Sequence, residues 1–137
     1  MIKMYSCYIM IKNTQEKARN HGLFGEKAAK NYLLERGYLI LHTNFRSRFG
    51  EIDIIAEKNR TIVFVEVKTR TESFIFGLPE ESFSRIKLRK IKCTIYSFFS
   101  GNPVLIHRPW RIDLITVTLN HFEETKRIVH YKNVEIY

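Results

Sequence analysis

The spacing of hydrophobic residues predicts a helix near the start of the chain. Phe24, Ala28 and Tyr32 recur every four residues, which places them on one side of a helix. Asn13, with an acid three residues later, fits an N-terminal capping box, and Gly37 fits a C-terminal cap. We therefore expect the first helix to begin near Asn13 and to end at Gly37.

The other hydrophobic stretches predict five strands and a second helix. Segments rich in Val, Ile, Phe or Tyr predict strands at residues 38–44, 51–56, 61–69, 112–119 and 128–136. Residues 57–60 fit a four-residue hairpin turn, and residues 45–50 a loop. The second helix would open at residues 77–81, where a proline and two acids suit a helix N-terminus, and run to about Phe99. The order αβββαββ predicts an α/β fold with a mixed central sheet flanked by helices.

Length and composition favour a single folded domain. With 137 residues, 45% hydrophobic and 27% charged, the chain can bury one core. We assign this domain to residues 13–137 and treat residues 1–12 as an N-terminal extension. Their apolar run is far shorter than the about 20 residues of a membrane span, and no signal-cleavage pattern follows it. Cys7 and Cys93 are too few for a disulfide scaffold, so we expect a cytoplasmic location.

Two charged residues interrupt the third predicted strand, which is apolar on both faces. Phe64 and Val65 point to opposite faces, a pattern typical of a central, buried strand. Glu66 and Lys68 stand two residues apart and therefore share one face. Burial of a carboxylate and an ammonium is costly, so these side chains are expected to form an ion pair or to bind a metal ion.

Two more acids are expected on the face that carries Glu66. With a four-residue turn, Asp53 lies opposite Phe64, and Glu51 lies opposite Glu66. Opposed carboxylates repel each other, so three acids on a half-buried face favour a bound cation. Mg²⁺ is a suitable cation because it prefers carboxylate oxygens and keeps several waters.

The first predicted helix adds a fourth acid. Glu26, Ala29 and Leu33 fall on one side of this helix, and Leu33 is expected to face the core. Glu26 would therefore point toward the sheet, the alternative being a charge that only stabilises the helix N-terminus. Its neighbour Gly25 has no side chain and would let the helix backbone approach the sheet closely.

Taken together, these residues resemble a known signature. Asp53, twelve intervening residues and then Glu66-x-Lys68 resemble the PD-(D/E)xK nuclease motif, although Ile52 stands at its proline position. A wider set of positions is similar to the YraN-like family of small bacterial proteins: residues 25–33, Gly37-Tyr38, Asn44-x-Arg46, 50–53, 63–70 and Phe76-Gly77. The similarity extends over roughly residues 22–119.

The resemblance implies a restriction-endonuclease-like fold, similar to that of Holliday-junction resolvases, and a metal-dependent nuclease site. Asp53 and Glu66 would then hold Mg²⁺ or Mn²⁺, with the carbonyl oxygen of Val67 as a further ligand. Lys68 would orient or activate the attacking water, and Glu26 would bind metal or water from the helix side.

The net charge of +9 favours a polyanion partner, and its distribution favours nucleic acid over a membrane surface. Arg46, Arg48 and Arg70 stand at the ends of the site strands, where a guanidinium can bind phosphate through two hydrogen bonds. Glu51 is either a metal ligand or a partner of Arg46 or Arg48. Five further cations are expected on the second helix, as a phosphate-binding track or as a solvated face: Arg85, Lys87, Arg89, Lys90 and Lys92.

The function expected from this resemblance is hydrolysis of DNA, branched or structured, in repair, recombination or processing. A homodimer would suit the two-fold symmetry of a DNA junction, although no self-complementary surface is visible in the sequence. Two alternatives stay open: a non-catalytic nucleic-acid-binding module, and an accessory protein whose acids are structural. Outside the site, we expect Asp113 to be a half-buried partner of an arginine, and Trp110 to be a core residue or a platform for a base.

Overall fold

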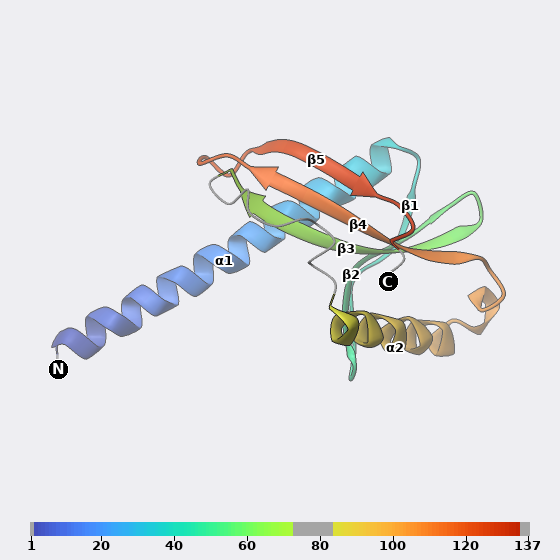
Figure 1. Ribbon diagram of the computed structural model, residues 1–137, viewed down its shortest axis with the longest axis horizontal. Coiled ribbons are helices and arrows are strands. Elements are labelled where there is room, and N and C mark those ends of the chain that lie inside the picture. Colours follow the sequence, from blue (N-terminus) through green and yellow to red (C-terminus); the bar gives the residue numbers. More distant parts are fainter. Residues whose placement is uncertain (1, 73–83, 135–137) are drawn as a thin grey trace.

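The fold is a five-stranded mixed sheet with one helix on each face (Figure 1). The structure, a computed structural model, describes residues 2–72 and 84–134, with side chains from residue 10 onward. The predicted order αβββαββ is confirmed, and a 3-10 turn, η2, follows the second helix. The elements are α1 (Ile2–Glu35), β1 (Leu39–Ser47), β2 (Gly50–Lys58), β3 (Thr61–Thr71), α2 (Arg85–Gly101), η2 (Pro103–Leu105), β4 (Trp110–Leu119) and β5 (Thr125–Tyr131).

The strands lie in sequence order across the sheet, from β1 to β5. Every neighbouring pair is antiparallel except β3 and β4, which are parallel and are joined by the crossover through α2. A parallel pair needs such a crossover, because the chain must return to the same end of the sheet before the second strand starts. This places β3 at the centre and covers it on both faces.

Two hydrophobic clusters on either side of β3 form the core. Val63 and Val65 pack in the cluster that α1 covers, together with Leu33 of that helix. Phe64 packs in the cluster that α2 covers and contacts Phe98 edge-on, at 5.6 Å between ring centroids. The two-sided apolar character that the sequence predicted for β3 is therefore confirmed, because successive side chains of a strand enter opposite layers.

Gly25 sets the distance between α1 and the sheet, as the sequence predicted. It is buried, and a Cβ atom placed on it would lie 1.8 Å from Oγ1 and 2.9 Å from Cβ of Thr69 in β3. Real atoms do not approach so closely, so any larger residue would push the helix away from β3. The close approach brings the next residue, Glu26, near Asp53 of β2.

Replacing Gly25 with alanine is expected to destabilise the protein by about 1–3 kcal/mol, because the added methyl group overpacks the contact with Thr69. Gly22→Ala is the matched control, since a Cβ atom at Gly22 of the same helix meets nothing within 4 Å. That control should leave stability unchanged or raise it by up to about 1 kcal/mol, the helix propensity of alanine over glycine. Urea denaturation of both variants measures the difference, and equal effects would refute the close-packing role of Gly25.

Helix α1 begins much earlier than the sequence predicted. It is continuous from Ile2 to Glu35, so Asn13 is an interior helical residue and the predicted cap is wrong. No proline and no glycine precede Gly22, and Lys, Gln, Glu and Ala are strong helix formers, so nothing ends the helix toward the N-terminus. Side chains 10–20 are exposed, and this part of α1 extends beyond the sheet (Figure 1). The division of the chain after residue 12 stays a prediction.

Both hairpins are tighter than predicted. Residues 45–47 belong to β1, and the loop shrinks to the two residues between Ser47 and Gly50. Asn59 and Arg60 have φ angles of 50° and 65°, typical of a two-residue turn, instead of the predicted four-residue turn. The pairing consequently shifts, with Val65 opposite Ile54. Glu51, Asp53 and Glu66 nevertheless meet in one pocket, as the predicted grouping of the acids requires.

The ends of two other elements also differ from the prediction. Helix α2 begins at Arg85, because Ser84 is extended and its side-chain oxygen accepts the N–H of Lys87 at 3.2 Å. The opening predicted at residues 77–81 lies outside the described residues. Strand β5 ends at Tyr131, because Asn133 has a φ of 51° and turns away from the strand direction, and the last two positions of the predicted strand, 135 and 136, lie outside the described residues.

Candidate functional site

The candidate site lies where β2 and β3 separate. The ladder between these strands runs from Lys58 opposite Thr61 to Ile54 opposite Val65, and Asp53 follows directly at its end. Its carboxylate Oδ2 accepts the N–H of Val67 at 2.7 Å, in place of a bond between the two backbones. Asp53 therefore lies in the fork between the strands, half-buried and held by a backbone donor.

A small pocket of about 160 Å³ opens between this fork and the first turns of α2. It brings together residues that are far apart in the sequence, from β2, β3 and α2. The lining residues are Gly50, Glu51, Asp53, Glu66, Lys87, Lys90 and Ile91. Three of the predicted acids therefore meet in one pocket with two lysines.

Burial in this crowded pocket raises the pKa of Asp53 from its ordinary 3.8 to about 7. The largest cause is the loss of water around the carboxylate, and the negative charge of Glu66 adds to it. Glu26 and Glu51 raise this pKa further, whereas the hydrogen bond from Val67 lowers it. Glu26 on α1 is thus close enough to act on Asp53, as the sequence predicted, and a cation would relieve the repulsion within the group.

Glu66 lies between two ammonium groups. Its Oε1 atom is 3.4 Å from Nζ of Lys68 and also accepts a short hydrogen bond from Nζ of Lys87. The Glu66 side chain is only 12% exposed. Burial lowers the pKa of Lys68, and the positive Lys87 beside it lowers this pKa further. Burial acts against the charge of Lys87, but its hydrogen bond to Glu66 and the negative charges of Glu66 and Asp53 raise the pKa of Lys87.

The pocket offers a divalent ion two carboxylates and not three. Within residues 2–72 and 84–134, no group of three or more His, Cys, Asp or Glu side chains is arranged to hold a metal ion. Glu51 is exposed and its Oε2 lies 3.3 Å from Nε of Arg46, which supports the ion-pair alternative for this residue. Asp53 and Glu66 remain, and Mg²⁺ is commonly bound by one or two carboxylates with water in its other positions.

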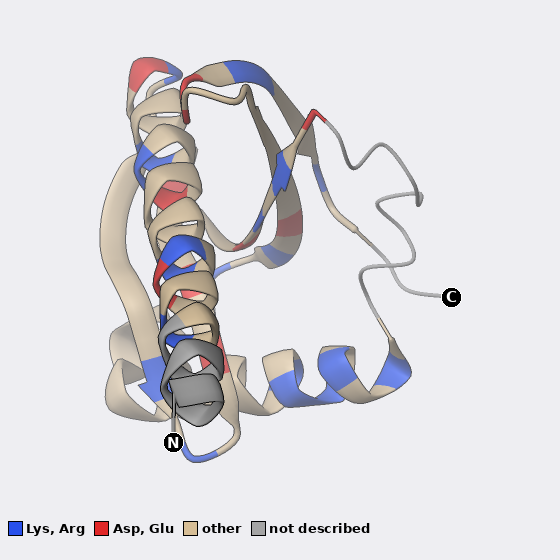
Figure 2. Cartoon of the chain, turned by 90° about the vertical axis from the view of Figure 1, so that its left-hand side faces the viewer, with Lys and Arg blue, Asp and Glu red and all other residues tan. Residues whose placement is uncertain are grey.

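The basic residues surround the pocket on two sides. Arg46 and Arg48 are exposed next to the β1–β2 turn, and Arg70 is half-buried in β3. Arg85, Arg89 and Lys90 are exposed along α2, whose basic bands are visible in Figure 2. In the part of the chain that the structure describes, no helix has the length and apolarity to cross a membrane.

Lys87 is the residue that the sequence interpretation placed differently. It was expected among the phosphate-binding cations of α2, yet its ammonium points into the pocket and contacts Glu66. The signal was present in the spacing, because Lys87 and the buried Ile91 stand four residues apart and share one side of α2. Its sequence neighbour Ile86, although apolar, is 71% exposed.

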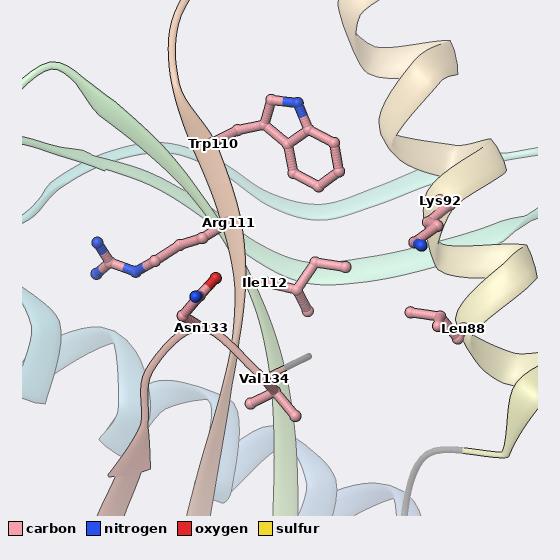
Figure 3. A pocket seen from close by; sticks show the side chains of 7 residues that line it. All are labelled: Leu88, Lys92, Trp110, Arg111, Ile112, Asn133 and Val134. Carbon is pink, nitrogen blue, oxygen red and sulfur yellow. The ribbon is translucent and has the colours of Figure 1, made fainter. Parts of the chain in front are cut away.

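A second pocket, of about 360 Å³, lies on the other side of α2 (Figure 3). Leu88 and Lys92 of α2 face Ile112 and Trp110 of β4 across it. Trp110 was expected to be a core residue or a stacking platform; it is 37% exposed and contacts Phe64 edge-on at 5.9 Å between ring centroids. The ring thus packs against the core and also borders the pocket.

Comparison with known proteins identifies relatives that cover most of the chain. A UPF0102 protein of Caldicellulosiruptor bescii is 46% identical over 99 residues, which are 72% of this chain and 82% of the relative. A UPF0102 protein of Clostridioides difficile is 45% identical over 121 residues, or 88% of this chain and 97% of the relative. One of Persephonella marina is 45% identical over 112 residues, or 82% and 90%.

The family model described as "Uncharacterised protein family UPF0102" matches residues 25–117. The match includes the close-packed Gly25, the fork at Asp53 and both lysines that contact Glu66. It agrees with the YraN-like resemblance read from the motifs. The chain therefore belongs to the uncharacterised protein family UPF0102.

Proposed function

We propose that this protein is a metal-dependent nuclease that hydrolyses phosphodiester bonds in DNA, with branched or structured DNA as its substrate class. The observation that carries this proposal is the half-buried Asp53, whose pKa is raised to about 7, in one pocket with Glu66, which is in turn paired with Lys68. Carboxyl and lysine groups with shifted pKa values in a shared pocket are characteristic of catalytic sites. We also assign the forked mixed sheet to the restriction-endonuclease-like class.

The chemistry follows from the positions of these side chains. Asp53 and Glu66 would hold Mg²⁺ or Mn²⁺, which neutralises phosphate charge and lowers the pKa of a bound water. Lys68, next to Glu66, can donate a hydrogen bond to the phosphate oxygen on which negative charge develops. Burial and the neighbouring Lys87 lower the pKa of Lys68, which favours proton transfer between its side chain and the attacking water.

The exposed cations would deliver the substrate. Arg46 and Arg48 lie beside the pocket on the β1–β2 hairpin, and Arg85 and Arg89 lie along α2. Arginines on two sides of a site can contact phosphates on both sides of the scissile bond. A basic surface around a pocket of carboxylates suits a polyanion whose reacting phosphate meets a metal ion.

A panel of substrates tests this function. Forked, four-way-junction, flap and single-stranded DNA are incubated with the protein in Mg²⁺, in Mn²⁺ and in EDTA, with matching RNA strands beside them. We expect metal-dependent cleavage of at least one DNA substrate, and a loss of about 100-fold or more in Lys68→Ala, as for removal of one transition-state donor. Arg108→Ala is the control, because it breaks the distant ion pair with Glu57. Cleavage that survives in Lys68→Ala would contradict the assignment.

One observation favours a second function, that of a nucleic-acid-binding module without catalysis. Glu66 already has two ammonium partners, and the described residues provide no three-acid metal group. Under this alternative, the same DNA panel shows salt-dependent binding that Lys68→Ala leaves intact, and no cleavage in any metal.

A further inference from the structure

The pocket contains a lysine, Lys87, for which the proposed reaction has no role. Lys87 extends from the first turn of α2 across the pocket, and its Nζ donates to Oε1 of Glu66. This is the oxygen that also lies 3.4 Å from Nζ of Lys68. Glu66 is therefore neutralised by the chain's own cations on the side that faces the pocket.

A metal ion and Lys87 compete for the same oxygen. A carboxylate oxygen that binds Mg²⁺ or Mn²⁺ at about 2.1 Å cannot keep an ammonium group in the same direction, because the two cations would repel each other at contact distance. Lys68 approaches from the same strand two residues away, whereas Lys87 reaches in from a different element. Since Lys87 is on a long, flexible stem, it can leave without any movement of the backbone.

We propose that Lys87 is an internal substitute for the metal ion: its ammonium occupies the pocket side of Glu66 and must be displaced before a divalent cation can bind. This inference rests on the proposed metal-dependent function and adds a regulation to it. The protein keeps Glu66 paired in the absence of metal, at the expense of metal affinity. Metal binding then turns Lys87 out toward the mouth of the pocket.

Direct measurement of Mn²⁺ binding tests this inference without any cleavage assay. Isothermal titration, or the loss of the free Mn²⁺ signal in electron paramagnetic resonance, gives Kd for wild type, Lys87→Met, Lys90→Met and Asp53→Asn. Lys90→Met is the matched control, because it removes the same charge from the same pocket and, among the described residues, Lys90 has no ion pair with an acid. Circular dichroism and thermal unfolding verify that each variant is folded.

We expect Lys87→Met to bind Mn²⁺ about tenfold more tightly than wild type, Lys90→Met to change Kd by less than about threefold, and Asp53→Asn to lose binding. Equal tightening in both lysine variants would mean a general charge effect and would overturn the inference. Unchanged or weaker binding in Lys87→Met would overturn it too, while wild-type binding that depends on Asp53 leaves the nuclease proposal standing. If neither the wild type nor any variant binds Mn²⁺, both the inference and the metal-dependent function fail.

Discussion

Replacing Asp53 with asparagine is expected to make the metal-free protein more stable at about pH 8, by about 2–4 kcal/mol. At this pH the wild-type protein must keep an ionised carboxylate in a pocket that raises its pKa from 3.8 to about 7. Such a shift costs the ionised folded state about 4 kcal/mol. Asparagine has nearly the same shape, carries no charge and keeps an oxygen that can accept the N–H of Val67.

The raised pKa of Asp53 also predicts how the stability gain of Asp53→Asn depends on pH. Between about pH 4 and about pH 7, the folded protein keeps the Asp53 proton that the unfolded chain has already released. The folded state therefore binds more protons, and the contribution of Asp53 to the free energy of unfolding falls as the pH rises through this range. Asp53→Asn lacks the titrating group, so its advantage over wild type should be small at about pH 4 and fully present above about pH 7.

Urea denaturation in EDTA at about pH 5 and pH 8 measures this difference, with Glu51→Gln as the control. Glu51 is exposed and pairs with Arg46, so its replacement should change the free energy of unfolding by less than about 1 kcal/mol. Added Mn²⁺ should reverse the order, because a ligand that binds only the folded wild type stabilises it. If Asp53→Asn is instead less stable than wild type at pH 8, Asp53 is a structural acid that anchors Val67, and the accessory-protein alternative gains support.

The central part of the sheet could be predicted because its physical signals are local. The apolar run around Phe64 and Val65 can only suit a strand covered on both faces, and a charged Glu66 in that run requires a partner. Gly25 was likewise interpretable, since a glycine beside a core position of a helix indicates close packing. These features need no knowledge of the rest of the chain, and the structure contains all of them.

The β2–β3 register, the start of α1 and the direction of Lys87 could not be predicted, because no local residue pattern signals them. The pairing of β2 with β3 follows from positive φ angles at Asn59 and Arg60, and arginine is not a residue that signals such a turn. The start of α1 depends on the absence of any helix-ending residue and not on a cap, so Asn13 was misleading.

In the site itself, the direction of Lys87 could not be predicted from the sequence. A lysine in a row of cations on α2 suggests a solvated face, and only the position of α2 over the fork turns it toward Glu66.

The largest loss of stability is expected from a residue outside the pocket, Asp113 in β4. It is fully buried, beyond the half-burial that the sequence predicted, and its arginine partner is Arg111, whose Nε lies 2.9 Å from Oδ1. Nε2 of His130 lies 2.8 Å from Oδ2, and the backbone N–H of Asn133 donates to Oδ1 at 2.8 Å. One carboxylate thus connects β4, β5 and the segment after β5. Although burial acts in the opposite direction, the hydrogen bonds from His130, Arg111 and Asn133 lower the pKa of Asp113.

Asp113→Leu is expected to lower the free energy of unfolding by about 3–5 kcal/mol, because it leaves the partly buried guanidinium of Arg111 and the buried ring of His130 without their acceptor. Urea denaturation at about pH 7 measures the loss, and Glu72→Gln is the control. Glu72 pairs with Lys126 at the surface, where the same loss of a charge should cost less than about 1 kcal/mol. Adding Arg111→Met to Asp113→Leu should recover part of the stability, since it removes the unpaired cation.

The pKa of Asp113 is lower in the folded state than in the unfolded chain. The contribution of Asp113 to the free energy of unfolding is therefore fully present above the unfolded pKa of about 4 and disappears as the pH falls through the lower folded value. This loss at acid pH is opposite in sign to the effect of Asp53. Measuring the free energy of unfolding of wild type, Asp53→Asn and Asp113→Leu over one pH series should therefore distinguish the two roles: ionised Asp113 stabilises the folded state, and ionised Asp53 destabilises it.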